Sequence, residues 1–312
     1  MKIAHISDLH FTTFFRKNNL DKIKHLLNYA IKFKFDHLVL SGDLTHNADQ
    51  ADFEILRNLF KEYSLLDSEK LSVVIGNHDI FGGPQTAEDI FLFPEKCRLV
   101  DYDKKVFEFG DYFSEAFQYC SDTKGGQYFP YVKKINDILI IGLNSIEKYS
   151  KLNNPFASNG KIYKDDYNFL ANILNKYYID FTKKLIIVHH HFNKIKVDKS
   201  KSGSSFWQNI EKQTMKLKKK KKLFQLFKMF NVDLVLHGHI HETGEYFRKG
   251  IRFLNAGSSV MGNNENELKI NFINLNNSDI NIETHKIILN TSTIVYDNIN
   301  ENNNNIYSLI NN

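Results

Sequence analysis

The chain has 312 residues, of which 42% are hydrophobic and 25% charged, and its formal net charge is +5. These values are ordinary for a soluble globular protein. A chain of this length buries roughly three quarters of its unfolded surface, so it needs no disulfide framework for stability. No apolar run approaches the ~20 residues that a membrane-spanning helix requires, and we expect no membrane span.

The first 75 residues alternate between apolar strands and amphipathic helices. Lys2–Ser7, His37–Leu40 and Leu71–Ile75 have the composition of strands. The stretches between them, Asn18–Lys34 and Asp49–Tyr63, place apolar residues at helical spacing. The order strand, helix, strand, helix, strand predicts parallel strands at the core of a layered α/β fold.

The middle of the chain is less regular. Lys104–Phe109, Tyr128–Lys134 and Asp137–Leu143 are predicted to be strands, and the last two are expected to form a hairpin. Asp165–Tyr177 is predicted to be a helix and Lys184–Val188 a buried strand.

Residues 192–230 are predicted to form an insertion, polar and irregular at first and helical at its end, Lys222–Phe230. The buried strand Val232–Leu236 follows it. The irregular part is far longer than the ~4–6 residues typical of connections in compact domains. We predict that it covers the site as a lid, with Phe206 or Trp207 contacting the organic part of the substrate. The alternative is a plain surface loop.

Six lysines lie between Lys216 and Lys222, in the sequence KLKKKKK, and without them the chain would be close to neutral. A run this short is usually a solvated face. The alternative is contact with phosphate or membrane, in which case the lysines would concentrate an anionic substrate near the site.

The C-terminal region, residues 262–290, has the pattern of a β-hairpin. Leu268–Leu275 and Ile280–Leu289 alternate apolar and polar residues around a turn rich in Asn and Asp, which tolerate left-handed backbone geometry. Residues 291–312 are Asn-rich with few large apolar side chains, and we expect a frayed tail there.

Two cysteines, Cys97 and Cys120, lie far apart with no CxxC motif or Cys/His cluster. A thiolate zinc site is therefore not expected, and two free thiols fit a reducing, cytoplasmic environment. No signal peptide is expected in the opening MKIAHISDLH, because cleavage there would remove Asp8 and His10, which are candidate metal ligands.

Five short segments share one pattern, in which apolar strand residues end in a burst of His, Asp or Asn. Ligand sites of open α/β sheets collect at the carboxyl ends of strands, so these side chains are expected to meet. Asp8-x-His10 or the Asp after Gly42 alone would most simply be a turn, and the His clusters at 189–191 and 237–241 are less easily explained in that way. All five in order indicate a metal site. The segments are HISDLH (5–10), LVLSGDL (38–44), VVIGNHD (73–79), LIIVHHH (185–191) and LVLHGHIH (234–241).

Two pairs of candidate ligands have the spacing i, i+2. Asp8 and His10 form one pair, and His239 and His241 the other. In an extended chain such residues project to the same side, so each pair can offer two ligands to one centre. His237 also lies two residues before His239, and His237/His239 is the alternative second pair.

A glycine directly precedes a candidate ligand at Gly42, Gly76 and Gly238. A sharp turn or close backbone approach at these positions would require a residue without a Cβ atom. Imidazole nitrogen mixed with carboxylate and amide oxygen suits borderline divalent ions such as Mn, Fe, Zn, Co or Ni.

The motifs D-x-H, G-D, G-N-H-D, a strand ending in His, and G-H-x-H, in this order, resemble the calcineurin-like metallophosphoesterase superfamily. The H-x-S-D-x-H opening and the His triplet resemble its bacterial class III cyclic-nucleotide phosphodiesterase branch. The resemblance covers roughly residues 1–260. It implies an α/β protein built as a four-layer α/β/β/α sandwich of two mixed β-sheets, in one domain over residues 1–290. Phe192 stands where the family often has proline.

The resemblance implies a site for two metal ions that activate a shared water for in-line attack on phosphorus. A neutral Asn among the ligands leaves the site with net positive charge for a phosphate oxyanion. The implied ligands are Asp8, His10 and His241 for one ion, Asn77, His189 and His239 for the other, and Asp43 as a bridge.

The resemblance further implies that His78 gives a proton to the leaving alkoxide and that Asp79 orients His78. His190 and His191 would then lie near the substrate or behind the ligands.

The implied activity is hydrolysis of a small phosphate ester, most simply a phosphodiester such as a cyclic nucleotide or a lipid- or glycerol-linked diester. The alternatives are a non-catalytic scaffold on the same fold and a nuclease, the latter if the lysine run contacts nucleic acid. Retention of all seven ligands and His78 favours the enzyme. The sequence leaves the substrate, the metal and the oligomeric state open.

Overall fold

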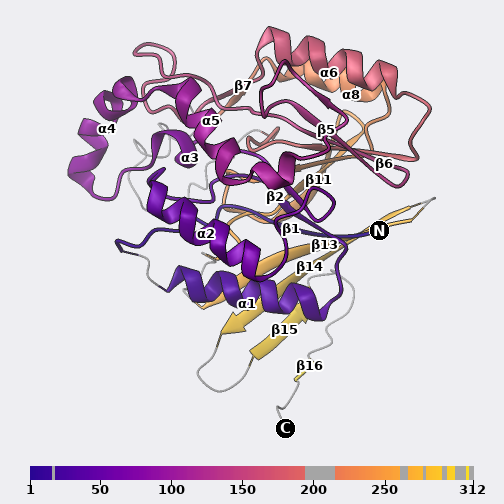
Figure 1. The fold of residues 1–312 in the computed structure, drawn as a ribbon, viewed down its shortest axis with the longest axis horizontal. Helices are drawn as coiled ribbons and strands as arrows, with labels where there is room; N and C mark the ends of the chain where they lie inside the picture. Colours follow the sequence, from indigo (N-terminus) through magenta and orange to yellow (C-terminus); the bar gives the residue numbers. More distant parts are fainter. Residues whose placement is uncertain are drawn as a thin grey trace.

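The computed structural model describes residues 1–15, 18–193, 215–260, 266–276 and 279–289, and the backbone of two further short strands. Two mixed β-sheets lie at the centre, and helices cover their outer faces (Figure 1). The predicted four-layer α/β/β/α sandwich is confirmed.

The first sheet has the strand order β16-β15-β14-β13-β1-β2-β3. Strands β1, β2 and β3 are parallel, and β13 joins β1 in the antiparallel sense. β1 therefore lies inside the sheet, between β2, which follows it closely in the sequence, and β13, which is far away in the sequence. The bounds are β1 Lys2–Ile6, β2 His37–Leu40, β3 Leu71–Val73, β13 Glu267–Leu275, β14 Ile280–Leu289, β15 Ile294–Asn298 and β16 Tyr307–Ser308.

The second sheet has the order β11-β12-β10-β8-β6-β5-β4. Strands β6, β8, β10 and β12 are parallel, and β5 and β11 are antiparallel to their neighbours. The bounds are β4 Asp122–Thr123, β5 Tyr131–Ile135, β6 Ile138–Gly142, β8 Lys183–Ile187, β10 Leu234–His237, β11 Gly244–Arg248 and β12 Ile251–Asn255.

The helices form the outer layers. Helix α1 packs on β13 of the first sheet, and α8 packs on β12 of the second, beside α6 in Figure 1. The bounds are α1 Asn19–Lys32, α2 Gln50–Glu62, α3 His78–Phe81, α4 Ala87–Leu99, α5 Tyr102–Tyr112, α6 Lys164–Lys176 and α8 Lys220–Met229, with a 3₁₀ turn at Ser114–Phe117 and a small pair of strands, β7 Gly160–Lys161 and β9 Leu217–Lys218.

Strand alternation explains the layers. In β6, Ile138 and Ile140 belong to the core between the two sheets, whereas Leu139 and Ile141 belong to the core under α6 and α8. Because successive side chains of a strand point to opposite faces, an all-apolar strand is buried on both sides. The continuous apolar runs of the sequence are therefore central strands.

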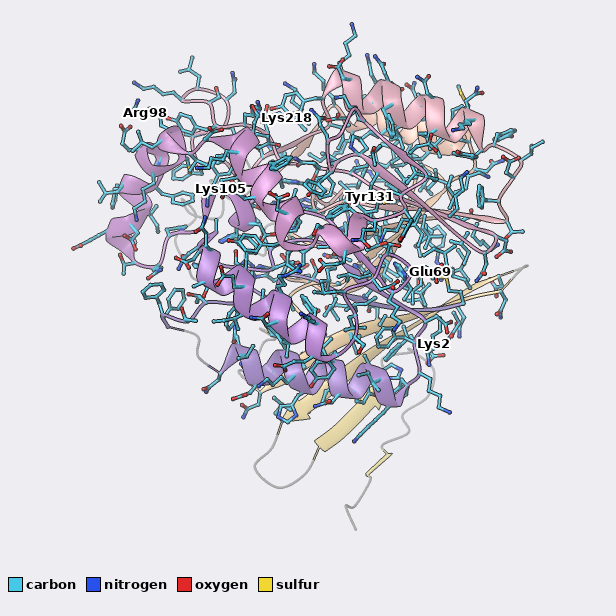
Figure 2. The ribbon with its side chains drawn as sticks, in the orientation of Figure 1. Lys2, Glu69, Arg98, Lys105, Tyr131 and Lys218 are labelled. Carbon is cyan, nitrogen blue, oxygen red and sulfur yellow. The ribbon has the colours of Figure 1, made fainter. Side chains whose placement is uncertain are left out.

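Two polar side chains of β5 tie the sheets together across the central core. The Tyr131 ring is fully buried (Figure 2), and its hydroxyl donates to the Val73 carbonyl at 3.1 Å. The buried Lys133 ammonium donates to the carbonyl oxygens of Ser68, at 2.9 Å, and of Leu71. Polar groups can lie in this core because each finds a backbone acceptor.

The predicted strand Lys104–Phe109 is wrong, because this segment lies inside helix α5. The Asp101 side chain caps the helix by accepting from the Lys104 amide at 3.1 Å. Phe109 is buried and its ring packs edge-on against Phe53 of α2, at 5.8 Å between centroids. Contacts between helices therefore decide the conformation of this segment.

Both predicted hairpins are confirmed. Strands β5 and β6 pair around Asn136, which has φ 54°, and β13 pairs with β14. The expected frayed tail is wrong in part, because β15 pairs with β14 and β16 pairs with β15. The rest of residues 291–312 lies outside the described residues, as do Phe206 and Trp207 of the predicted lid.

The lysine run is divided between two elements. Lys218 lies in β9, where its ammonium pairs with Glu147 and donates to the Asn153 carbonyl at 2.9 Å, and Lys220 begins α8. Lys218 is therefore a structural contact, whereas Lys221 and Lys222 are exposed. No helix in the described part of the chain is long and apolar enough to cross a membrane.

Candidate metal centre

The candidate ligands lie just beyond the carboxyl ends of strands from both sheets. β1, β2 and β3 lead to Asp8, Asp43 and Asn77, whereas β8 and β10 lead to His189 and His239. Backbone hydrogen bonds fasten these loops to one another, including Asp8 N to Gly42 O at 3.0 Å and Gly238 N to His189 O at 3.1 Å. The site therefore spans the seam between the two sheets.

Four candidate ligands have a left-handed backbone: Asp8 at φ 53°, His10 at 43°, Asp43 at 53° and His239 at 76°. Such conformations cost ~1–3 kcal/mol each and persist only where the surroundings impose them. The expectation that i, i+2 spacing in extended chain brings the pairs together is therefore wrong. Tight turns deliver the side chains instead.

The glycine prediction is confirmed. A Cβ atom on Gly42, which has φ 98°, would lie 2.5 Å from Nδ1 of His189. A Cβ atom on Gly76 would overlap the carboxylate and the backbone nitrogen of Asp43. On Gly238 it would overlap Asp8 and Ser7. Each glycine leaves the space that a candidate ligand occupies.

The first group of side chains consists of Asp8, His10 and His241, which the structure brings close enough to share one metal ion. Nε2 of His10 lies 3.1 Å from Nε2 of His241 and 3.9 Å from Oδ1 of Asp8. His241 is the most exposed of the three, so this group faces the entrance of the site.

The second group contains Asp43, His189 and His239, and it is completely buried. Nε2 of His189 lies 3.1 Å from Nδ1 of His239 and 3.2 Å from Oδ1 of Asn77. All seven predicted ligands therefore lie together, in two adjacent groups.

One atom connects the two groups. Oδ2 of Asp43 lies 3.3 Å from Nε2 of His189 and 3.8 Å from Nε2 of His10. The other oxygen of this carboxylate, Oδ1, accepts the His78 backbone N–H at 2.8 Å, which fixes its orientation. Asp43 is thus placed where a bridging ligand would be.

The donor set fits metal ions. Nδ1 of His189 must carry a proton, because it donates to the Ser41 carbonyl at 2.8 Å. In the neutral ring Nε2 then carries a lone pair, and this lone pair faces the acceptor oxygens of Asn77 and Asp43. A hydrogen-bonded Nδ1–H is the usual arrangement behind a histidine ligand. Lone pairs that converge in this way repel one another unless a cation lies between them.

The charges point the same way. Burial opposes a charge on the His189 ring, but the carboxylates of Asp43 and Asp8 raise its pKa to about 9. Burial also raises the pKa of Asp8 to about 7, whereas His189 and His78 hold the pKa of Asp43 well below its usual range despite burial. The buried carboxylates of the cluster therefore favour a positive charge between them, which divalent cations would supply.

His78 and Asp79 are close to the ligands but not arranged as the resemblance implied. The Asp79 carboxylate accepts from the backbone N–H of Thr45 at 2.8 Å and of Gly76 at 2.9 Å. Nδ1 of His78 instead donates to the His46 carbonyl at 3.1 Å. Asp79 therefore joins the loops after β2 and β3 and does not hold the His78 ring.

Two further histidines of the motifs, His190 and His237, have hydrogen-bond partners outside the two groups. His190 contacts Ser145 Oγ at 2.8 Å and the Ser158 carbonyl at 3.2 Å, so it lies behind the ligands. Nε2 of His237 accepts from the Tyr246 hydroxyl at 2.7 Å. The geometry thus favours His241, and not His237, as the partner of His10 and Asp8.

His46 was not anticipated from the sequence. It is 6% exposed, and together with His10 and His78 it forms a third cluster of ring nitrogens. Its place three residues after Asp43, in the segment that carries a bridging candidate, is the signal that could have found it.

The family model for calcineurin-like phosphoesterases matches residues 1–243, more than three quarters of the chain and all of the candidate ligands. The chain belongs to the calcineurin-like phosphoesterase family. It is 23% identical over 268 residues to a probable cyclic nucleotide phosphodiesterase of Ruthia magnifica subsp. Calyptogena magnifica, covering 85% of this chain and 88% of the relative.

Solved structures agree on the fold of this calcineurin-like phosphoesterase. A dimetal phosphatase from Danio rerio superimposes with a TM-score of 0.53 at 12% identity, over 96% of this chain and 95% of the other. A purple acid phosphatase from yellow lupin (Lupinus luteus) gives a TM-score of 0.50 at 12% identity, over 99% of this chain and 52% of the other.

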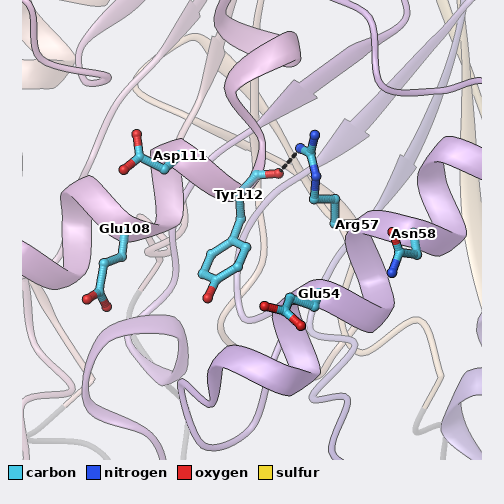
Figure 3. A pocket seen from close by; sticks show the side chains of 6 residues that line it. All are labelled: Glu54, Arg57, Asn58, Glu108, Asp111 and Tyr112. Atoms are coloured by element: carbon cyan, nitrogen blue, oxygen red, sulfur yellow. Dashed lines mark hydrogen bonds between the residues drawn. The ribbon is translucent and has the colours of Figure 1, made fainter.

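A separate cavity of about 530 Å³ lies between α2 and α5 (Figure 3). Glu54, Glu108 and Asp111 are among the described residues that line it, and Arg57, which also lines it, pairs with Glu115. It contains none of the candidate ligands, and its acidic wall would repel a phosphate ester.

Proposed function

We propose that this calcineurin-like phosphoesterase is a phosphodiesterase that hydrolyses a P–O bond at a centre of two divalent metal ions. The observation that supports the proposal is that Asp43 Oδ2 lies between the two groups, 3.3 Å from Nε2 of His189 and 3.8 Å from Nε2 of His10. A carboxylate oxygen between two ligand groups suits a pair of ions, because it is shared by both.

Asp8, His10 and His241 would hold one ion, and Asn77, His189 and His239 the other, with Asp43 between them. When bound, the ions lower the pKa of a shared water and neutralise charge on the phosphoryl group. The protein itself contributes in two ways. The left-handed backbone turns hold the ligand side chains in place, and burial of the second group excludes bulk water.

His78 is the proposed proton donor to the leaving oxygen. Its Nδ1 is engaged by the His46 carbonyl, which leaves Nε2 to carry the proton that is transferred. Its ring lies 4.5 Å from the His10 ring, so the donor is next to the phosphoryl position that the ligands define. A positioned acid of this kind contributes ~10²–10⁴-fold to a rate.

A diester substrate is proposed because the relative that matches most of the chain is named as a probable cyclic nucleotide phosphodiesterase. A cyclic nucleotide is the substrate proposed for the first test.

The test uses protein reconstituted with Mn²⁺ after metal removal. Bis(p-nitrophenyl) phosphate and 3′,5′-cyclic AMP should be hydrolysed with higher kcat/KM than the monoester p-nitrophenyl phosphate. Asp43→Ala should lose both ions and the activity, whereas the exposed Asp21→Ala should keep both. A well-folded wild type that binds one ion or none would contradict the two-metal proposal, and preference for the monoester would contradict the diesterase.

A further inference from the structure

The His78 ring needs a partner to hold it, because Asp79 is engaged with the backbone elsewhere. We propose that His46 is a positioning residue that fixes the orientation of the His78 imidazole. The proposal rests on the proposed function, since it takes His78 as the proton donor.

The first contact is through the backbone. Nδ1 of His78 donates to the carbonyl oxygen of His46 at 3.1 Å. A carbonyl can only accept, so Nδ1 keeps its proton and Nε2 is the nitrogen that exchanges one with the substrate. This bond sets the tautomer but leaves the ring free to pivot about it.

The second contact is between the rings and removes that freedom. The centroids of His46 and His78 lie 4.9 Å apart with planes at 43°, and the His10 ring meets His78 edge-on from another side at 4.5 Å. The His46 ring is itself held edge-on by Phe15 at 5.1 Å. His78 is therefore confined between a candidate ligand and a braced neighbour.

Gly83 closes the third side of the same space. A Cβ atom there would overlap the His78 ring and would lie 3.2 Å from Cε1 of His46. The two rings thus share one tight cradle with no room for another side chain. Deleting the His46 ring would open a space beside His78 and let it rotate away from the leaving oxygen.

The expected cost follows from the geometry. A displacement of about 1 Å in a reacting group lowers a rate by up to ~10²-fold. His46→Ala should therefore lower kcat by about 10- to 100-fold, with little change in KM, because the variant retains the ligands and the phosphoryl position. His46→Phe, which keeps a flat ring in the cradle, should recover most of the loss.

The decisive experiment is a double-mutant cycle on a diester with a poor leaving group, with the exposed His25→Ala as the matched histidine control. If His46 acts through His78, adding His46→Ala to His78→Ala should cause no further loss, whereas independent effects would multiply. Metal content, measured by elemental analysis, should equal that of the wild type in every variant.

Three results would overturn the proposal: multiplicative losses in the double variant, a His46→Phe enzyme as slow as His46→Ala, or loss of a metal ion in His46→Ala. The last would make His46 a ligand in the cluster with His10 and His78.

If the wild type hydrolyses no ester, the proposed function is wrong, but the positioning role of His46 can still be tested without activity. The ¹⁵N signals of the His78 ring should then show one Nδ1–H tautomer in the wild type and exchange broadening in His46→Ala. Sharp, unchanged signals in His46→Ala would refute the positioning role.

Discussion

At the residue scale, the centre depends on residues held in backbone conformations that they do not prefer. Four candidate ligands have positive φ, and adjacent glycines leave the space that the ligands occupy. A strained backbone of this kind holds the ligand atoms in place before a metal ion binds. Less reorganisation of the protein is then needed when the ion binds. Substitutions that touch no ligand atom should therefore still disrupt the centre.

Gly76→Ala tests this directly. The new methyl group would overlap the Asp43 carboxylate and backbone nitrogen, so the bridge has to move. We expect loss of both metal ions with secondary structure retained, measured by elemental analysis and circular dichroism. Gly244→Ala is the control, because a Cβ atom there meets nothing within 4 Å. Full metal content in Gly76→Ala would show that the bridge tolerates displacement.

His78→Ala should separate chemistry from metal binding. The His78 side chain belongs to neither ligand group of the proposed centre, so both ions should stay. Turnover of a diester with a poor leaving group should fall by ~10²–10⁴-fold, the usual contribution of a positioned acid. Measuring kcat across leaving groups checks the role, since substrates with good leaving groups need little protonation. A loss below about tenfold on the poorest leaving group would exclude His78 as the donor.

At the element scale, prediction from sequence succeeded wherever a strand is buried on both faces. The apolar runs that end in His or Asp are β1, β2, β3, β8 and β10, and their motifs allowed the seven candidate ligands to be named. The contacts of Asp79 and of the His46 ring could not be predicted, because both depend on how the loops after β2 and β3 pack against each other.

The predicted helices α1, α2, α6 and α8 are confirmed, whereas α4 and α5 were not predicted as helices. In α5, Phe107 and Phe109 alternate as in a strand, but the helix buries Phe109 and leaves Phe107 54% exposed. In α4, Pro94 lies inside the helix and Phe91 is 80% exposed, so neither periodicity nor composition marks it. A short amphipathic segment can form either a strand or a helix, and its tertiary contacts decide which one it adopts.

Strand β5 gives a prediction about pH. Burial lowers the pKa of Lys133 from its ordinary value of 10.5 to about 8. Between these pH values the unfolded chain binds the proton that the folded protein releases, so the free energy of unfolding should rise with pH, by about 3 kcal/mol at most. Lys133→Met should remove this rise, and the exposed Lys134→Met should retain it. Urea unfolding at pH 7.5 and pH 10 measures the difference.

At the scale of the whole molecule, the proposed centre joins the two sheets. Asp8, Asp43 and Asn77 follow strands of the first sheet, and His189, His239 and His241 follow strands of the second. Ions bound here would cross-link the layers, and anything that binds only the folded state stabilises it by mass action.

Metal removal should therefore lower the stability of the entire domain. At a free metal concentration a thousand times Kd, each site adds ~4 kcal/mol to the free energy of unfolding. Chelation should lower Tm in one cooperative transition, and added Mn²⁺ should restore it. Asp43→Ala should unfold at the same temperature with and without chelator. If the wild-type Tm is the same with and without chelator, the ions do not couple the sheets.

The order of strands in the first sheet also governs when during synthesis this protein can work. β1 is synthesised long before β13, yet β13 is one of its two neighbours in the sheet. The proposed ligands run from residue 8 to residue 241, so no nascent chain that stops short of His241 carries the full set. Domains fold as units behind the advancing ribosome. A translation product that stops before His241 would therefore lack part of the proposed centre, and we expect hydrolysis only from chains that extend beyond it.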